Sequence, residues 1–242
     1  ASEVPRPSRV PDQDLGVGPK NIWTQPYGLR TFADLFTNRQ LTALTTFADL
    51  ASEVRERVVA DAITASLARG ERLAAGGPGG EAYAGAVVTY LGLAVSRLAD
   101  WSNALCRWES VGQVSQQLFG KQAIGMAWDF SEANTLGTSS GSFVAALNYV
   151  ASALEKLNGQ TDALATQEDA ASRSYQGFVV NTDPPYYDNI GYSDLSDFFY
   201  VWLRRALGTT WPELLATLLV PKQSELVANA YRHGGPTEAS EF

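Results

Sequence analysis

The sequence predicts an α/β fold in which helices dominate, and two observations predict it. Apolar residues recur at the 3.6-residue spacing of amphipathic helices along much of residues 37 to 157, and again in residues 193 to 207. The run Gly177 to Asp183 is instead short, with the consecutive apolar residues Phe178, Val179 and Val180 as its core, as in a buried strand. Because a helix pattern follows this strand closely, we expect helices packed around a small sheet.

Three segments are expected along the chain. Residues 1 to 36 are rich in proline, glycine and polar residues and predict an irregular extension. Residues 37 to 175 predict a helical region that ends in a polar linker. Residues 176 to 242 contain the predicted strand, a loop, a final helix and a tail, and no internal repeat is present.

The helical region should contain a long helical pair and a third helix. Thr37 and Gln40 match a capping box, so the first helix should begin there and run into the sixties. The GGPGG run then ends this pattern. A third helix is expected from Ser142 to Leu157. The second helix should pack antiparallel against the first through one stripe of Tyr83, Val87, Tyr90, Ala94, Leu98, Trp101, Leu105 and Trp108.

The final helix is expected to begin near Ser193. Asp194 and Asp197 fall in its first turn and Arg204 and Arg205 in its last, so these charges complement the helix dipole. A phosphate contact by the two arginines is the less favoured alternative. The apolar face should consist of Leu195, Phe198, Phe199, Trp202, Leu203 and Ala206.

Composition restricts the kinds of partner. The formal net charge is −8, whereas a chain that wraps duplex DNA on its own is usually basic. Contact with nucleic acid would therefore need a local basic patch or additional sequence. No apolar run of transmembrane length and no signal pattern appear, so no membrane partner is expected.

Cysteine and histidine are too scarce for a metal site. Cys106 is the single cysteine, which excludes an internal disulfide and a zinc site made of several thiolates. It should behave as a small buried hydrophobic residue, and it fits a cytoplasmic location. His233 is the single histidine and lacks partners for a metal site or a nucleophilic triad. No metal is expected.

Asp183, Pro184, Pro185 and Tyr186 stand where a strand should end and a helix should follow. Ligands of open α/β sheets bind beyond such strand ends. An exocyclic amine of adenine or cytosine is a poor nucleophile, and two hydrogen-bond acceptors are needed to activate it. The Asp183 carboxylate and the Pro184 carbonyl would accept from the amine, with the prolines fixing the carbonyl direction. Tyr186 would stack on a flipped base.

The loop after this motif has two interpretations, and both stay open. Tyr187, Asp188, Asn189 and Tyr192 would hold the flipped base or its neighbours. Alternatively they form a turn that uses asparagine and glycine, with Ser193 as the helix cap.

D-P-P-Y resembles the catalytic motif of amino-methyltransferases, and longer stretches resemble the adenine-specific DNA methylases that contain a zinc ribbon. The resemblance implies a partial Rossmann-like methyltransferase domain that transfers a methyl group from S-adenosylmethionine to DNA, with adenine favoured over cytosine. It implies that Asp183 and Pro184 also contact the cofactor. The matching stretches are TDPPYYDNIGYSDLSDFFYVWLRR, YGLRTFADLFTNRQLTALTTFADL, YLGLAVSRLADWSNALCRW and LVPKQSELVANAYRHGG.

Two family features are missing. The acidic-Pro-Phe-x-Gly-x-Gly cofactor motif is not found, since AAGGPGGEAY joins two helices and follows no strand. The zinc ribbon is missing because Cys106 stands alone. We therefore expect a fragment whose partners are DNA and the remaining part of the methyltransferase chain. Alone it should be inactive and should bind S-adenosylmethionine weakly or not at all.

Several alternatives accompany this reading. The amine acceptor could be cytosine N4, RNA or another amine. Pro184 to Tyr187 also match P-P-x-Y, a ligand pattern of WW domains, and the chain could be a helical interaction module without catalysis. For Lys222, Arg232 and His233 a DNA-facing role and a solvated loop are both open. Trp128 to Asn134 should form a packed turn.

Overall fold

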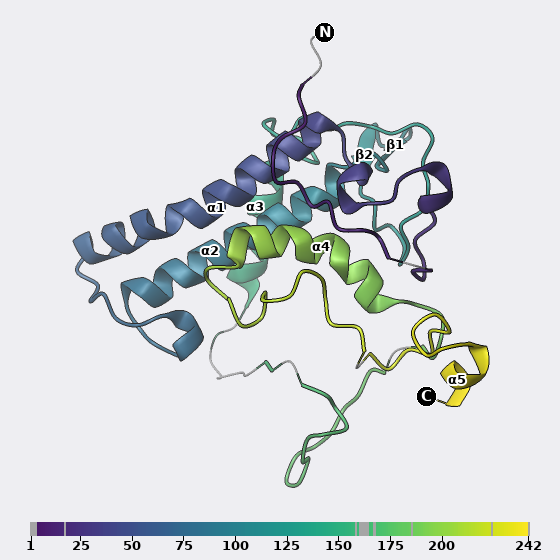
Figure 1. The fold of residues 1–242 in the computed structure, drawn as a ribbon. Helices are drawn as coiled ribbons and strands as arrows, with labels where there is room; N and C mark the ends of the chain where they lie inside the picture. The colour runs from purple at the N-terminus through teal and green to yellow at the C-terminus, as the bar shows by residue number, and fades with distance from the viewer. Residues whose placement is uncertain are drawn as a thin grey trace.

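A computed structural model describes residues 4–16, 18–157, 159, 165–166, 168–184, 186–223 and 225–241. The predicted site residue Pro185 lies outside the described residues. In Figure 1 the long helices lie side by side, with a small hairpin at one end and a long loop that leaves the helical body. The helices are α1 (Asn38–Thr64), α2 (Gly80–Trp101), α3 (Phe143–Lys156), α4 (Tyr192–Leu207) and α5 (Pro236–Glu241), the strands are β1 (Arg107–Glu109) and β2 (Val114–Gln116), and the 3-10 turns are η1 (Gln25–Tyr27), η2 (Phe32–Leu35) and η3 (Leu73–Ala75).

The capping box and the antiparallel helical pair are confirmed. The Thr37 hydroxyl accepts from the Gln40 amide at 3.2 Å, and the Gln40 side chain accepts from the Thr37 amide at 2.8 Å. The last half of α1 meets the start of α2, where the Arg55 guanidinium donates to Glu81 at 2.5 Å. The helix predicted from Ser142 is α3, and the Ser142 side chain caps it.

The apolar stripe predicted for the second helix is only partly confirmed: Ala94, Leu98 and Leu105 are buried, but its aromatic ends are not. α2 ends at Trp101, and Trp108 lies in β1 with 58% of its surface exposed. Tyr83 is also exposed, at 55%, because α2 lies between α1, α3 and α4 and turns its smaller residues toward them. A Cβ on Gly92 would lie 2.7 Å from the Leu207 side chain, so this face has no room for aromatic rings. The buried face includes Ala84, Val88, Val95, Leu98 and Ala99.

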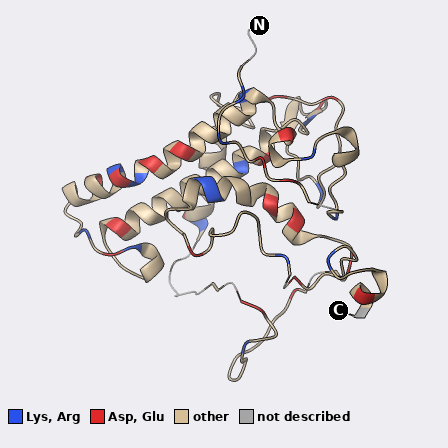
Figure 2. Cartoon of the chain, in the orientation of Figure 1, with Lys and Arg blue, Asp and Glu red and all other residues tan. Residues whose placement is uncertain are grey.

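The apolar face of α4 forms part of the core. Phe198 and Trp202 are buried and both contact Phe36, with ring centroids 5.6 and 5.3 Å apart. The predicted residues Phe199 and Leu203 are half-buried at the margin of this face. Figure 2 shows acidic residues at the start of α4 and basic residues at its end, as the sequence predicts.

The segment before Thr37 is irregular, but it is not a separate extension. Six of its apolar residues are buried in the same core as the helices: Leu15, Ile22, Phe32, Ala33, Leu35 and Phe36. The Leu35 carbonyl also accepts from the Ala104 amide at 2.8 Å, just beyond the end of α2. Residues 4–16 and 18–36 therefore cover the end of the helical pair where α1 begins.

The strand predicted from Gly177 to Asp183 is not formed. Phe178, Val179 and Val180 have exposed fractions of 64%, 101% and 51%, and the segment belongs to no sheet. Among the described residues the named strands are β1 and β2, which pair antiparallel elsewhere in the fold. An apolar strand is buried only where neighbouring strands pair with it, and none is adjacent here. The Rossmann-like sheet therefore stays a prediction.

α2 is as long and as apolar as a helix that crosses a membrane. By length and composition α2 could cross a membrane, since an 18-residue window has a mean hydropathy of 1.3. By this criterion the expectation that no apolar run reaches transmembrane length does not hold for α2. However, 56% of that window is buried inside the structure. Core helices pass the same test, and packing against three helices accounts for the apolar composition of α2.

Cys106 should be chemically inert in the folded protein. The thiol is fully buried, and burial raises its pKa to about 11. Because the thiolate is the reactive form, we expect a thiol reagent at mildly alkaline pH to label the native protein about 100-fold more slowly than the urea-unfolded protein. Equal labelling rates in the two states would show that Cys106 is accessible.

Candidate functional site

Asp183, Pro184 and Tyr186 lie on the long segment between α3 and α4 (Figure 1). All three are exposed, and 65% of the Tyr186 surface is accessible. The Asp183 carboxylate accepts no hydrogen bond from, and forms no ion pair with, any described residue. The carboxylate, the Pro184 position and the aromatic ring are thus close in the chain and open to a ligand.

The turn that follows the motif is anchored to the rest of the fold. Tyr187 adopts a left-handed backbone with φ +36°, and the Asn189 amide closes the turn by donating to the Tyr186 carbonyl at 2.8 Å. The Ala228 amide donates to the Tyr187 carbonyl at 3.0 Å. Lys20 donates to the Asp188 carbonyl and lies 3.7 Å from its carboxylate. Two distant segments therefore hold this turn.

The side chains of the predicted loop residues do not form an enclosed site for a base. Tyr187, Asp188 and Asn189 are exposed, and Tyr192 is half-buried as the first residue of α4. The predicted cap is also wrong, because the N-cap position is Gly191 rather than Ser193. Ser193 instead donates from its amide and its hydroxyl to the Glu225 carboxylate, at 2.7 and 2.5 Å. Glu225 thus accepts from the Ser193 amide, one of the amides that have no partner within the helix at the start of α4.

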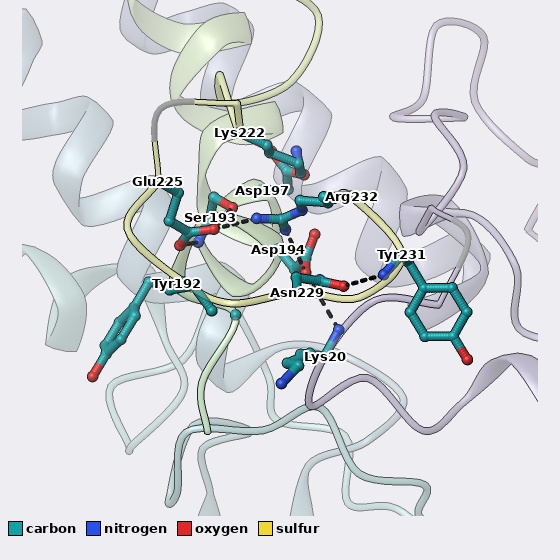
Figure 3. A network of polar contacts seen from close by, with 12 residues as sticks. Lys20, Tyr192, Ser193, Asp194, Asp197, Lys222, Glu225, Asn229, Tyr231 and Arg232 are labelled. Atoms are coloured by element: carbon teal, nitrogen blue, oxygen red, sulfur yellow. Dashed lines mark hydrogen bonds and ion pairs between the residues drawn. The ribbon is translucent and has the colours of Figure 1, made fainter. Parts of the chain in front are cut away.

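Residues 219–223 and 225–235, which we call the strap, cross the start of α4 (Figure 3). Lys222 pairs with Asp197 at 2.5 Å. Arg232 contacts Asp194 at 2.7 Å and also pairs with Glu225. The Lys222 and Arg232 side chains are only 25% and 17% exposed, so neither is a free DNA-facing cation or part of a solvated loop.

The two aspartates of α4 are far more buried than a dipole role requires. Asp194 is 7% exposed and Asp197 is 3% exposed. Burial raises the pKa of Asp197, while hydrogen bonds from Lys222 and the Val220 amide oppose that shift. The Lys20 amide also donates to Asp194 at 3.3 Å. Buried carboxylates beside the apolar face of a helix need cations as partners. Asp194 and Asp197, which stand among apolar residues, are therefore the sequence feature that indicates a basic segment packed against the start of α4.

His233 is part of the strap, whereas the Trp128 to Asn134 turn is a separate segment. The His233 ring lies 3.3 Å from the Val227 carbonyl. Trp128 is 81% exposed, so the expected packed turn is wrong for that residue, although its ring makes an edge contact with Tyr27 at 5.2 Å. Among the described residues, no group of three or more His, Cys, Asp or Glu side chains could hold a metal ion.

Five cavities in the described part of the chain are lined by segments other than the motif, and none of these five includes a residue from 178 to 184 or from 186 to 189. The Asp183 carboxylate and the Pro184 carbonyl are groups that can accept hydrogen bonds. None of these five cavities would place S-adenosylmethionine beside them.

No protein-family model, no curated protein and no solved structure matches this chain. The motif and the residues around it are therefore the features from which a function can be proposed.

Proposed function

We propose that the chain provides the amine-accepting part of a DNA methyltransferase active site, with N6 of adenine as the acceptor. One observation carries the proposal. Asp183 and Tyr186 are exposed and open to a ligand, on a backbone that is anchored at the next residues through Tyr187 and Asp188. An anchored backbone with free functional groups is suited to preorganised binding.

The proposed chemistry uses one carboxylate and one carbonyl. Asp183 accepts one N–H of the adenine amine and the Pro184 carbonyl accepts the other. These two hydrogen bonds stabilise the positive charge that develops on the nitrogen as it is alkylated. Tyr186 stacks on the flipped base, for which its exposed ring is available. S-adenosylmethionine is the proposed methyl donor, and its binding site belongs to the remaining part of the methyltransferase chain.

The exposed apolar residues before the motif support this division. Phe178, Val179 and Val180 are more than half exposed, although strands and cores normally bury such side chains. An extended apolar segment of this kind can add to a sheet edge. On this proposal it pairs with sheet strands of the remaining methyltransferase chain, which would bring Asp183 to the end of a strand.

The experiment is methyl transfer by the intact enzyme. It should incorporate the labelled methyl group of S-adenosylmethionine into DNA, and digestion of the product should release N6-methyladenine. Release of N4-methylcytosine would replace adenine by the cytosine alternative, and label in RNA alone would exclude DNA as the substrate. Failure to methylate any of these amines would overturn the proposal.

A second candidate is a ligand of WW domains, and exposure is the observation that favours it. Pro184, Tyr186 and Tyr187 are all exposed. However, Tyr187 has a left-handed backbone and its carbonyl is bonded to Ala228, whereas such ligands need a free polyproline helix. We expect the folded chain to show no binding to isolated WW domains in a fluorescence titration. Binding that Tyr187→Ala abolishes would favour this candidate.

A further inference from the structure

A cavity of about 430 Å³ lies beside the last half of α4. Arg9, Arg204 and Arg205 line it together, and no carboxylate belongs to the lining. The rest of the wall is mainly apolar and includes Val10, Val201, Trp202, Leu215 and Leu218. In a chain with a net charge of −8, three arginines around one cavity without an acidic residue are unexpected.

Arg205 is committed to holding the wall of this cavity. Its Nε and Nη2 donate to the two carboxylate oxygens of Asp49, both at 2.6 Å. Its Nη1 donates to the Arg9 carbonyl. Arg9 has φ +61°, a left-handed conformation that costs a non-glycine residue about 1 kcal/mol. The Asp49–Arg205 pair therefore keeps Arg9 in an unfavourable backbone conformation beside the cavity.

Arg9 and Arg204 have no such partners. Neither guanidinium forms an ion pair or a hydrogen bond with a described residue. The Nε of Arg204 is enclosed by protein atoms and is likewise unpaired. Arg204 is only partly exposed, whereas Arg9 is exposed. A partly desolvated guanidinium without a counter-charge is unfavourable, so a bound anion would compensate chiefly at Arg204.

We propose that this cavity binds a phosphate group, carried by a nucleic acid or by a free phosphate compound. Arg9 and Arg204 contact the phosphate oxygens, because planar guanidinium groups match phosphate geometry with paired hydrogen bonds. Arg205 acts as the positioning residue for Arg9. The cavity volume lies in the range of small-molecule sites. The proposal does not depend on methyl transfer, so either proposal can fail without the other.

The test is calorimetric titration of the chain with pyrophosphate, with a short single-stranded DNA and with succinate as a non-phosphate anion. We expect Arg9→Gln and Arg204→Gln each to weaken phosphate binding about tenfold. The control is Arg57→Gln, which removes the same charge from a side chain that is 82% exposed on α1 and should change affinity by less than about twofold. Circular dichroism checks that each variant is folded.

The ligands separate the two phosphate sources. Binding of DNA without pyrophosphate would identify a nucleic-acid backbone as the ligand. Binding of pyrophosphate without DNA would identify a free phosphate compound, and binding of both would support the phosphate group itself as the recognised feature. The proposal is overturned if neither phosphate ligand binds, if succinate binds equally well, or if both arginine variants retain wild-type affinity.

Discussion

In the methyltransferase that we propose, Asp183→Asn is expected to slow methyl transfer by about 10² to 10³-fold, the loss typical of removing one preorganised hydrogen-bonding group from a transition state. The substitution keeps the size of the side chain but replaces a charged acceptor by a neutral amide. The free energy of unfolding should not change, because Asp183 is exposed and contacts no described partner. Single-turnover rates and urea unfolding measure the two effects separately.

Asp129→Asn is the matched control. It makes the same chemical change at an exposed aspartate outside the motif, whose carboxylate forms no ion pair or hydrogen bond with a described residue. We expect the methylation rate to stay within about threefold of wild type. Equal losses in the two variants would mean that the loss of one negative charge, rather than acceptance from the amine, explains the effect of Asp183.

Arg232→Met is expected to have the largest effect on stability. Arg232 is the cation shared by Asp194 and Glu225, whose side chains are only 8% and 12% exposed. Removing one partner from a buried ion pair leaves uncompensated charge and costs about 3 to 5 kcal/mol. Because Arg232 keeps some contact with water, we expect the lower end of that range. Urea unfolding monitored by tryptophan fluorescence measures it.

Arg57→Met is the control for this prediction, since its pair with Asp61 is exposed on both sides. It should change the free energy of unfolding by less than about 0.5 kcal/mol. If Arg232→Met costs no more than this control, the strap is not held by its ion pairs. Hydrogen exchange gives an independent result: the Ala228 amide should exchange faster in Arg232→Met, because it is bonded to Tyr187 from within the strap.

The strap connects stability to the proposed site. Lys222 and Arg232 hold its two ends against α4, and Ala228 between them bonds to the residue after the motif. The start of α4, the strap and the motif turn therefore form one connected unit. Loosening the strap should move the turn without altering Asp183 or Tyr186 themselves.

Local patterns predicted the helices well. α1, α3 and α4 follow from periodic apolar residues, and the Thr37 and Ser142 caps mark where α1 and α3 begin. Each of these signals involves residues that are close together in the sequence. The stripe predicted for α2 is right at Ala94 and Leu98 but wrong at Tyr83, because close packing at Gly92 selects small residues. The segment before Thr37 has no periodicity, so its place in the core was not visible in the sequence.

Long-range partners explain the remaining errors. The apolar run at Phe178 to Val180 predicts a strand only if neighbouring strands exist, and no single segment contains that information. The start of α4 also contacts a residue far away in the sequence, since the Lys20 amide donates to Asp194, 174 residues later. The chemistry proposed for Asp183 and Tyr186, by contrast, needs only adjacent residues and was therefore accessible from sequence.

The central claim is that Asp183 accepts a hydrogen bond from the exocyclic amine, and base binding by the intact enzyme tests it most directly. Oligonucleotides with adenine or with purine, which lacks that amine, are titrated against wild type and Asp183→Asn by fluorescence anisotropy. We predict that Asp183→Asn weakens binding of the adenine oligonucleotide about tenfold and leaves purine binding unchanged. Equal weakening of both, or of neither, would contradict the proposed contact.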